Sequence, residues 1–102
     1  MQEKISVIIA SYNYGAFLEE AVQSVLNQTR MPDEILITDD CSADNSFEIA
    51  QMYQKLYPGL VRANRNEKNL GIVDNFNHAI SLLDHKGYVC FLGGLKIDTQ
   101  PL

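Results

Sequence analysis

The sequence predicts an α/β fold in which a parallel sheet carries helices on both faces. Runs of β-branched and aliphatic residues at 5–10 and 35–38 end abruptly in small polar groups, which is typical of strands buried on both faces. Segments with helical spacing of apolar residues alternate with such runs along the 102-residue chain. This alternation indicates parallel strands joined by right-handed helical crossovers, and therefore a Rossmann-like βαβαβαβ sheet.

The elements follow one another without an obvious linker. A first helix is expected over residues 15–28, a second from Ser42 or Asp44 to Tyr57, and a third from about Gly71. Short strands near 60–63 and at 88–92 complete the sheet. Residues 1–93 are expected to form one α/β domain, and residues 94–102, which show no clear period, an irregular or truncated tail. The residues expected to face the core from the three helices are Phe17, Leu18, Ala21, Val22, Val25, Leu26, Ile49, Ala50, Tyr53, Leu56, Tyr57, Val73, Phe76, Ala79, Ile80 and Leu83.

Composition excludes some classes of protein. Eight basic and thirteen acidic residues give a net charge of −5, and no stripe of Lys or Arg suggests a nucleic-acid partner. No apolar run approaches the length of a membrane span, and residues 1–4 lead straight into a strand without a signal peptide. The two cysteines make no disulfide framework, and Cys90 is expected as a buried free thiol. A reducing, cytoplasmic setting fits both cysteines.

Two neighbouring carboxylates, Asp39 and Asp40, follow the second strand. The carboxyl ends of parallel strands are where open α/β sheets bind ligands. One carboxylate is then suited to accept N–H or O–H donors of a ligand, and the other to cap the following helix. The alternative is that both are helix-start acids stabilised by the helix dipole.

The first strand ends in Ala10, Ser11, Tyr12 and Asn13. The Tyr12 ring offers a flat face to a nucleobase, and the small Ala10 allows close approach. The alternative is a core tyrosine, with Asn13 shaping the turn into the first helix.

A third candidate region is Asn69-Leu70-Gly71, which opens the third helix. Gly71 permits an unusual backbone angle, and the amino terminus of a helix can receive an anion such as a diphosphate. The alternative is an ordinary helix-start turn, with solvated amides at Asn75 and Asn77 and an exposed His78.

These stretches together resemble the inverting family 2 glycosyltransferases over about residues 4–93. The resemblance rests on five segments in the right order and spacing, which are VIIASYN at 7–13, SVLNQT at 24–29, EILITDDCS at 34–42, NLG at 69–71 and YVCFL at 88–92. It implies a GT-A fold, here truncated, and a nucleotide-sugar donor, with a UDP-sugar favoured.

The same resemblance implies roles for individual residues. Ala10 and Tyr12 would border the base, Asp40 would accept the pyrimidine N3–H, and Asp39 would shape the pocket. Asn69, Gly71 and the residues up to Asn77 would flank the nucleotide. No residue of the chain is assigned as catalytic.

The chain departs from the family pattern in several places. The family often has Arg at the position of Phe76, and an Asp-x-Asp motif that holds Mg²⁺ or Mn²⁺ after the fourth strand. Here residues 93–96 read GGLK, and the only nearby carboxylate, Asp98, is out of register. A divalent cation is thus expected for the family, while its ligands are missing from this chain.

The acceptor-binding half and the general base of the family would lie beyond residue 102. The chain is therefore expected to be a donor-binding half that transfers little or no sugar alone, with a saccharide acceptor in the full enzyme. The alternative is a non-catalytic nucleotide-binding or interaction module. A response-regulator-like domain fits poorly, because such a domain has acids after its first strand, whereas here the acids follow the second strand. The family favours bacterial polysaccharide synthesis as the process, and the expected location is the cytoplasm or the inner membrane surface. A homodimer is also expected, formed through an exposed fourth strand.

Overall fold

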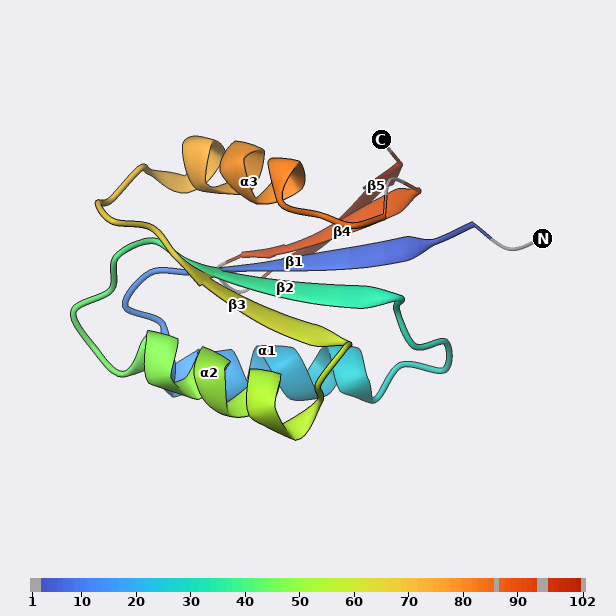
Figure 1. Cartoon of the computed structure of the whole chain (residues 1–102), viewed down its shortest axis with the longest axis horizontal. Coiled ribbons are helices and arrows are strands. Elements are labelled where there is room, and N and C mark those ends of the chain that lie inside the picture. The colour runs from blue at the N-terminus through green and yellow to red at the C-terminus, as the bar shows by residue number, and fades with distance from the viewer. Residues whose placement is uncertain (1–2, 86, 94–95, 102) are drawn as a thin grey trace.

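The computed structural model describes residues 3–85, 87–93 and 96–101 (Figure 1). The expected order of strands and helices is confirmed, with one further strand at the end. In chain order the elements are β1 (Ile5–Ser11), α1 (Gly15–Leu26), β2 (Glu34–Asp39), α2 (Ser46–Leu56), β3 (Val61–Arg65), α3 (Ile72–Ser81), β4 (Tyr88–Gly93) and β5 (Lys96–Pro101).

The strands form one sheet in the order β3-β2-β1-β4-β5. The first four are parallel, as the sequence predicts, and β5 pairs with β4 in the antiparallel sense. The pairing places Ser11 beside Asp39, and Asp39 beside Arg65. The carboxyl ends of β1, β2 and β3 therefore meet along one edge of the sheet.

Helices cover both faces of the sheet, with α1 and α2 on one face and α3 on the other (Figure 1). A larger apolar cluster lies under α1 and α2 and a smaller one under α3. The edge-to-face contact of Phe76 and Phe91, with ring centroids 4.8 Å apart, belongs to the smaller cluster. Phe76 stands where the resembled family often has Arg, and here it is half-buried and packs against the smaller cluster.

Some of the residues expected in the core lie outside it. Phe17 is 48% exposed at the first turn of α1, and Leu56 and Tyr57 are exposed where α2 ends. Val73 is 70% exposed, because α3 turns Asn75 and Ala79 inward instead. The inner face of α3 predicted from apolar spacing is therefore wrong at Val73, because a polar residue, Asn75, occupies one of the positions packed against the sheet.

The prediction of an irregular tail is wrong for residues 96–101, which form β5. A strand at the edge of a sheet presents unpaired N–H and C=O groups, and β5 supplies partners for those of β4. The expectation of an exposed β4 edge is therefore also wrong, and Leu92 is buried. Leu95 lies outside the described residues, and the domain boundary at 93 stays a prediction.

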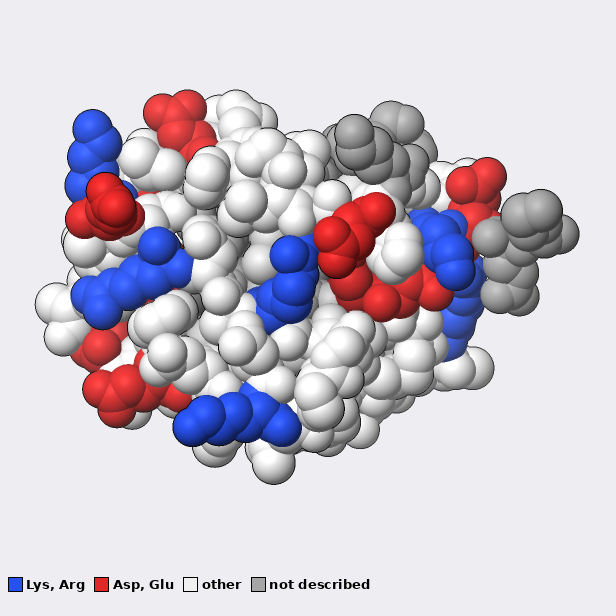
Figure 2. Space-filling view, viewed as in Figure 1, with Lys and Arg blue, Asp and Glu red and all other residues white. Residues whose placement is uncertain are grey.

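At the opposite edge of the sheet, a side chain of helix α2 accepts a hydrogen bond from the backbone of strand β3. The Gln54 side chain of α2 accepts a hydrogen bond from the backbone N–H of Ala63 at 2.7 Å. On the face shown in Figure 2, acidic and basic side chains lie interspersed. None of the described helices combines the length and apolar character needed to cross a bilayer.

Glu34 anchors the end of the sheet that faces away from the polar rim. Its carboxylate is buried and accepts hydrogen bonds from the Ser6 hydroxyl at 2.7 Å and from the backbone N–H groups of His85 and Asp84 at 2.8 and 3.1 Å. Burial raises the pKa of Glu34, but these hydrogen bonds outweigh it, so the pKa lies below its ordinary value of 4.5. Glu34 also forms an ion pair with Arg62, whose Nη2 lies 3.4 Å from Glu34 Oε2.

We expect Glu34→Gln to lower the free energy of unfolding at pH 7 by about 2 kcal/mol, because hydrogen bonds to a charged acceptor are lost. The stabilisation from Glu34 is complete above pH 4.5 and is lost as the pH falls through the lower folded-state pKa. Urea unfolding across this pH range measures both effects. Glu19→Gln on the exposed side of α1 is the control, and an unchanged pH dependence in Glu34→Gln would contradict the assignment.

Candidate functional site

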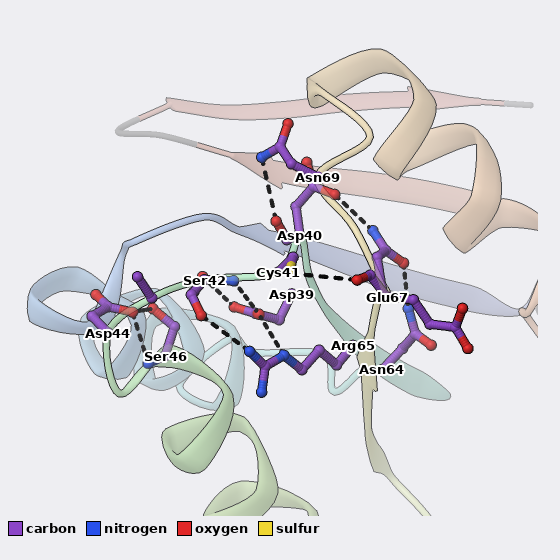
Figure 3. Close-up of polar contacts among 12 residues, drawn as sticks. Asp39, Asp40, Cys41, Ser42, Asp44, Ser46, Asn64, Arg65, Glu67 and Asn69 are labelled. Atoms are coloured by element: carbon purple, nitrogen blue, oxygen red, sulfur yellow. Dashed lines mark hydrogen bonds and ion pairs between the residues drawn. The ribbon is translucent and has the colours of Figure 1, made fainter.

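Polar side chains gather where β1, β2 and β3 end and α3 begins (Figure 3). The sequence-predicted residues Tyr12, Asp39, Asp40 and Asn69 all lie in the segments that meet there. Their surroundings differ, since Asp39 and Asp40 are 0% and 3% exposed while Tyr12 is 54% exposed. The rim thus consists of a buried carboxylate layer with an open aromatic ring beside it.

Asp40 binds the loop that leads into α3. Its Oδ1 accepts hydrogen bonds from Leu70 N–H at 2.8 Å and Asn66 Nδ2 at 2.9 Å, and its Oδ2 accepts one from Gly71 N–H at 2.9 Å. The Asn69 side chain donates to the Asp40 carbonyl at 3.3 Å. A carboxylate has about four acceptor positions. Three are filled here, so Oδ2 keeps one acceptor position for another donor.

Asp39 stabilises the turn that follows its own strand. Its two oxygens accept hydrogen bonds from the backbone N–H and the hydroxyl of Ser42. The Arg65 Nε lies 4.0 Å from Asp39 Oδ2, and the Arg65 guanidinium also donates to the Ser42 carbonyl at 3.2 Å. Cys41, at the tip of this turn, has a φ of +64°, a left-handed conformation that is uncommon outside glycine. Asp39 therefore supports the rim from within.

The turn after β1 is joined to the turn after β2. Asn13 N–H donates to the Ser42 hydroxyl at 2.9 Å, and Asn13 Oδ1 accepts from Ala43 N–H at 2.8 Å. With a φ of +50°, Asn13 is the turn residue that the sequence suggests. The alternative of a core tyrosine at position 12 is wrong, because the ring faces solvent beside this turn. Ala10 is half-buried in β1.

Asp44 caps α1 from a neighbouring segment. It accepts hydrogen bonds from the backbone N–H of Gly15 at 3.0 Å and from Ser46, whose hydroxyl is in turn 2.9 Å from Tyr14 N. Burial raises the pKa of Asp44, but the bonds from Ser46 and Gly15 prevail and lower it. The first donors of α1 are therefore satisfied by protein groups.

Gly71 adopts a backbone conformation that other residues avoid. Its φ of +90° and ψ of +165° fall in a region that is almost exclusive to glycine. The sequence prediction of an unusual angle at this position is confirmed. The N–H groups of Leu70 and Gly71 both donate to the Asp40 carboxylate at the start of α3.

A buried network of amides lies beneath the rim. Asn66 was not among the predicted site residues, whereas Asn75 lies in the stretch up to Asn77 that the resemblance places along the nucleotide. Asn66 and Asn75 are 6% and 2% exposed, so the alternative of a solvated amide at position 75 is wrong. Asn66 Nδ2 donates to Asn75 Oδ1 at 2.8 Å, and the Thr38 hydroxyl donates to the same oxygen at 2.9 Å. The sequence signal was the placement of Asn75 four residues before Ala79 and eight before Leu83, on the inner side of α3.

A cavity of about 640 Å³ opens beside this loop, a size within the range of ligand pockets. Its lining includes the basic residues Arg65 and Lys68 and the acidic residue Glu67, together with His78. His78 is exposed, as the sequence predicts. The cavity adjoins the rim through Asn66, which also contacts Asp40.

The side chains that the structure describes do not fit a divalent cation. In the part of the chain that the structure describes, no group of three or more His, Cys, Asp or Glu residues is placed to hold a metal ion. The oxygens of Asp39 and Asp40 already accept hydrogen bonds from protein donors. The expectation that this chain lacks the family's metal ligands stays a prediction.

Known proteins share both the sequence pattern and the fold. The putative teichuronic acid biosynthesis glycosyltransferase TuaG of Bacillus subtilis is 36% identical over 88 residues, which are 86% of this chain and 34% of TuaG. Staphylococcus aureus TarS 1–349, solved in complex with UDP-GlcNAc, superposes with a TM-score of 0.75 and 27% identity over 88% of this chain and 26% of that chain. GalNAc-T7, solved with UDP, GalNAc and Mn²⁺, gives a TM-score of 0.80 and 28% identity over 89% and 18%.

The chain spans about a third or less of the length of the curated relatives that it matches. The model of glycosyl transferase family 2 matches residues 6–94, which is nearly all of the described chain. The parallel sheet with helices on both faces is the fold of its structural neighbours, which are GT-A glycosyltransferases. The chain belongs to glycosyl transferase family 2.

Proposed function

We propose that this chain binds a nucleotide-sugar donor at the rim formed by Ala10, Tyr12, Asp39, Asp40, Asn69 and Gly71. The observation that carries the proposal is an exposed aromatic ring beside a buried carboxylate that keeps one acceptor position. This pair suits a nucleobase, whose face can stack and whose N–H can donate.

In this proposal the base stacks on Tyr12 and a pyrimidine N3–H donates to Asp40 Oδ2. Ala10 leaves room for the base, and Asp39 keeps the turn around it in shape through Ser42. Asn69 and Gly71 border the nucleotide at the start of α3. A UDP-sugar is the preferred donor, because TarS and GalNAc-T7 were solved with uridine nucleotides.

The reaction proposed for the full-length protein is an inverting transfer. A general base takes the proton of an acceptor hydroxyl while the oxygen attacks the anomeric carbon, and the nucleoside diphosphate leaves with the electrons of the broken bond. We assign neither the base nor the saccharide acceptor site to the described residues. The chain alone is therefore proposed to bind the donor and to transfer little or no sugar.

Two broader proposals follow from relatives and composition. The relation to TuaG favours polysaccharide biosynthesis as the process. The two free cysteines favour a cytoplasmic location, with the inner membrane surface as a second option. The argument for a homodimer was an exposed edge at β4, and it no longer applies because β5 pairs with β4.

A non-catalytic nucleotide-binding or interaction module is the second candidate function. It is favoured by the poor fit of the described side chains to a divalent cation. A nucleotide-binding module would share UDP binding with the first candidate, so transfer activity of the longer protein separates these two. An interaction module would bind no nucleotide.

UDP titrated into the wild-type chain in a calorimeter is expected to bind. Tyr12→Ala should weaken binding by about 1–3 kcal/mol, the usual worth of base stacking on an aromatic ring. Asp40→Asn should weaken it by a similar amount, because a charged acceptor is lost. Asp84→Asn, exposed at the far end of the sheet, is the control. Equal affinity in all four proteins, or no wild-type binding at 1 mM UDP, about −4 kcal/mol, would overturn the proposal.

The same titration with Mn²⁺ tests the fit of the metal. We expect the ion to change UDP affinity by less than about threefold, because the described part of the chain places no group of three or more His, Cys, Asp or Glu side chains to hold it. A transfer assay with UDP-sugars and this chain alone is expected to give no product above background. Strong enhancement by Mn²⁺, or transfer at rates of about 1 s⁻¹ or more, would contradict these expectations.

Gly71→Ala compared with Gly59→Ala separates stability from binding. Both glycines have positive φ, +90° and +84°, and an added Cβ would meet nothing within 4 Å at either position. Each variant should therefore lose about 1–3 kcal/mol of stability through backbone strain. Only Gly71→Ala should also weaken UDP binding, because Gly59 lies in the turn before β3, at the other end of the sheet. Equal effects of the two variants on UDP affinity would argue against a site at Gly71.

A further inference from the structure

We propose that Asn66 and Asn75 are positioning residues of the nucleotide site, which fix the Asp40 carboxylate and, through it, the loop at 69–71. The inference rests on the proposed function and adds to it two buried amides that lie beneath the rim and are given no contact with the ligand.

The hydrogens of the Asn66 side chain are fully used. One is donated to Asp40 Oδ1 at 2.9 Å and the other to Asn75 Oδ1 at 2.8 Å. The Asn66 oxygen in turn accepts from Asn64 Nδ2 at 3.0 Å. An amide at position 66 therefore has one assignable orientation, because the reversed amide would direct its oxygen at two acceptors.

Asn75 gives this amide a fixed partner from the opposite side. Its Oδ1 accepts from Asn66 and from the Thr38 hydroxyl, and its Nδ2 lies 3.3 Å from the Thr38 carbonyl. Asn64 Nδ2 also donates to the Thr38 hydroxyl at 3.0 Å, which closes a ring of four side chains. The ring connects β2, β3 and α3 directly below Asp40.

Asp40 is the member of this network nearest the proposed ligand. Its Oδ1 carries the bonds from Asn66 and Leu70, so these two donors set the rotation of the carboxylate. That rotation decides where the remaining acceptor position of Oδ2 points. Buried polar networks that are fully satisfied specify one arrangement of the groups around them.

An apolar residue would suit the inner face of α3 as well as Asn75 does for packing alone. Ala79 and Leu83 occupy the next inward positions and pack in the apolar cluster with Ile8. The polar pair at 66 and 75 is thus better explained by the orientation of Asp40 than by packing.

The test combines amide hydrogen exchange with UDP titration on the 102-residue chain, at a temperature where circular dichroism shows each variant folded. In Asn66→Ala, exchange at Leu70 and Gly71 should become at least tenfold faster, while the core amides Ile8 and Ile37 keep their protection. UDP should bind about tenfold more weakly, as expected for the loss of one hydrogen bond to a charged group.

Asn75→Leu is the second variant, because it removes the acceptor for Asn66 without touching Asp40, and it should show the same pattern in a weaker form. Gln51→Ala on the exposed side of α2 is the control. Wild-type UDP affinity in both asparagine variants, or equal acceleration of core and loop amides, overturns the positioning role. A wild-type chain that binds no UDP overturns the proposed function itself, and the role of the network in a nucleotide site with it.

Discussion

The carboxylate of Asp40 connects three segments that are far apart in the sequence. It follows β2, and it accepts hydrogen bonds from Asn66 after β3 and from the two residues that precede α3. The N–H groups of Leu70 and Gly71 both donate to this carboxylate, and Gly71 lies outside the ordinary regions of backbone conformation. The geometry of the rim therefore depends on one buried acid that lies at its centre.

The sheet is held at both ends by carboxylates that accept backbone N–H groups. Glu34 binds the segment before β4, while Asp40 binds the segment before α3. These acids are buried and engaged, whereas Tyr12 is open to solvent. The arrangement separates a rigid frame from an exposed aromatic surface, which is what a ligand site on strand-end loops needs.

The fold could be predicted from sequence because its signals are local. Buried parallel strands are continuous apolar runs, and α1 and α2 carry clear helical spacing of apolar residues. The order of the elements and the layers of the fold could therefore be predicted. The inner face of α3 could not be placed, because Asn75 points inward for the sake of Thr38 and Asn66, partners that are distant in sequence. Strand β5 was missed since its pairing with β4 depends on register and not on periodicity.

The candidate site was predicted in the same uneven way. The resemblance pointed to Tyr12, Asp39, Asp40, Asn69 and Gly71, and the structure brings the segments that carry them to one rim. What each acid does could not be read from its type. Asp39 and Asp40 are adjacent and chemically identical, but successive side chains of a strand point to opposite faces. Asp39 therefore meets the turn over α1 and α2, and Asp40 meets the loop over α3.

The contact between Gln54 and the outer strand β3 has a consequence for how this molecule can meet others. A peptide or a second sheet that joins a strand edge needs the free N–H groups of that edge. The Gln54 side chain already occupies the N–H of Ala63 in the middle of β3, and the charged Arg62 and Arg65 flank it. Recognition by strand addition is thereby disfavoured at the β3 edge of the sheet.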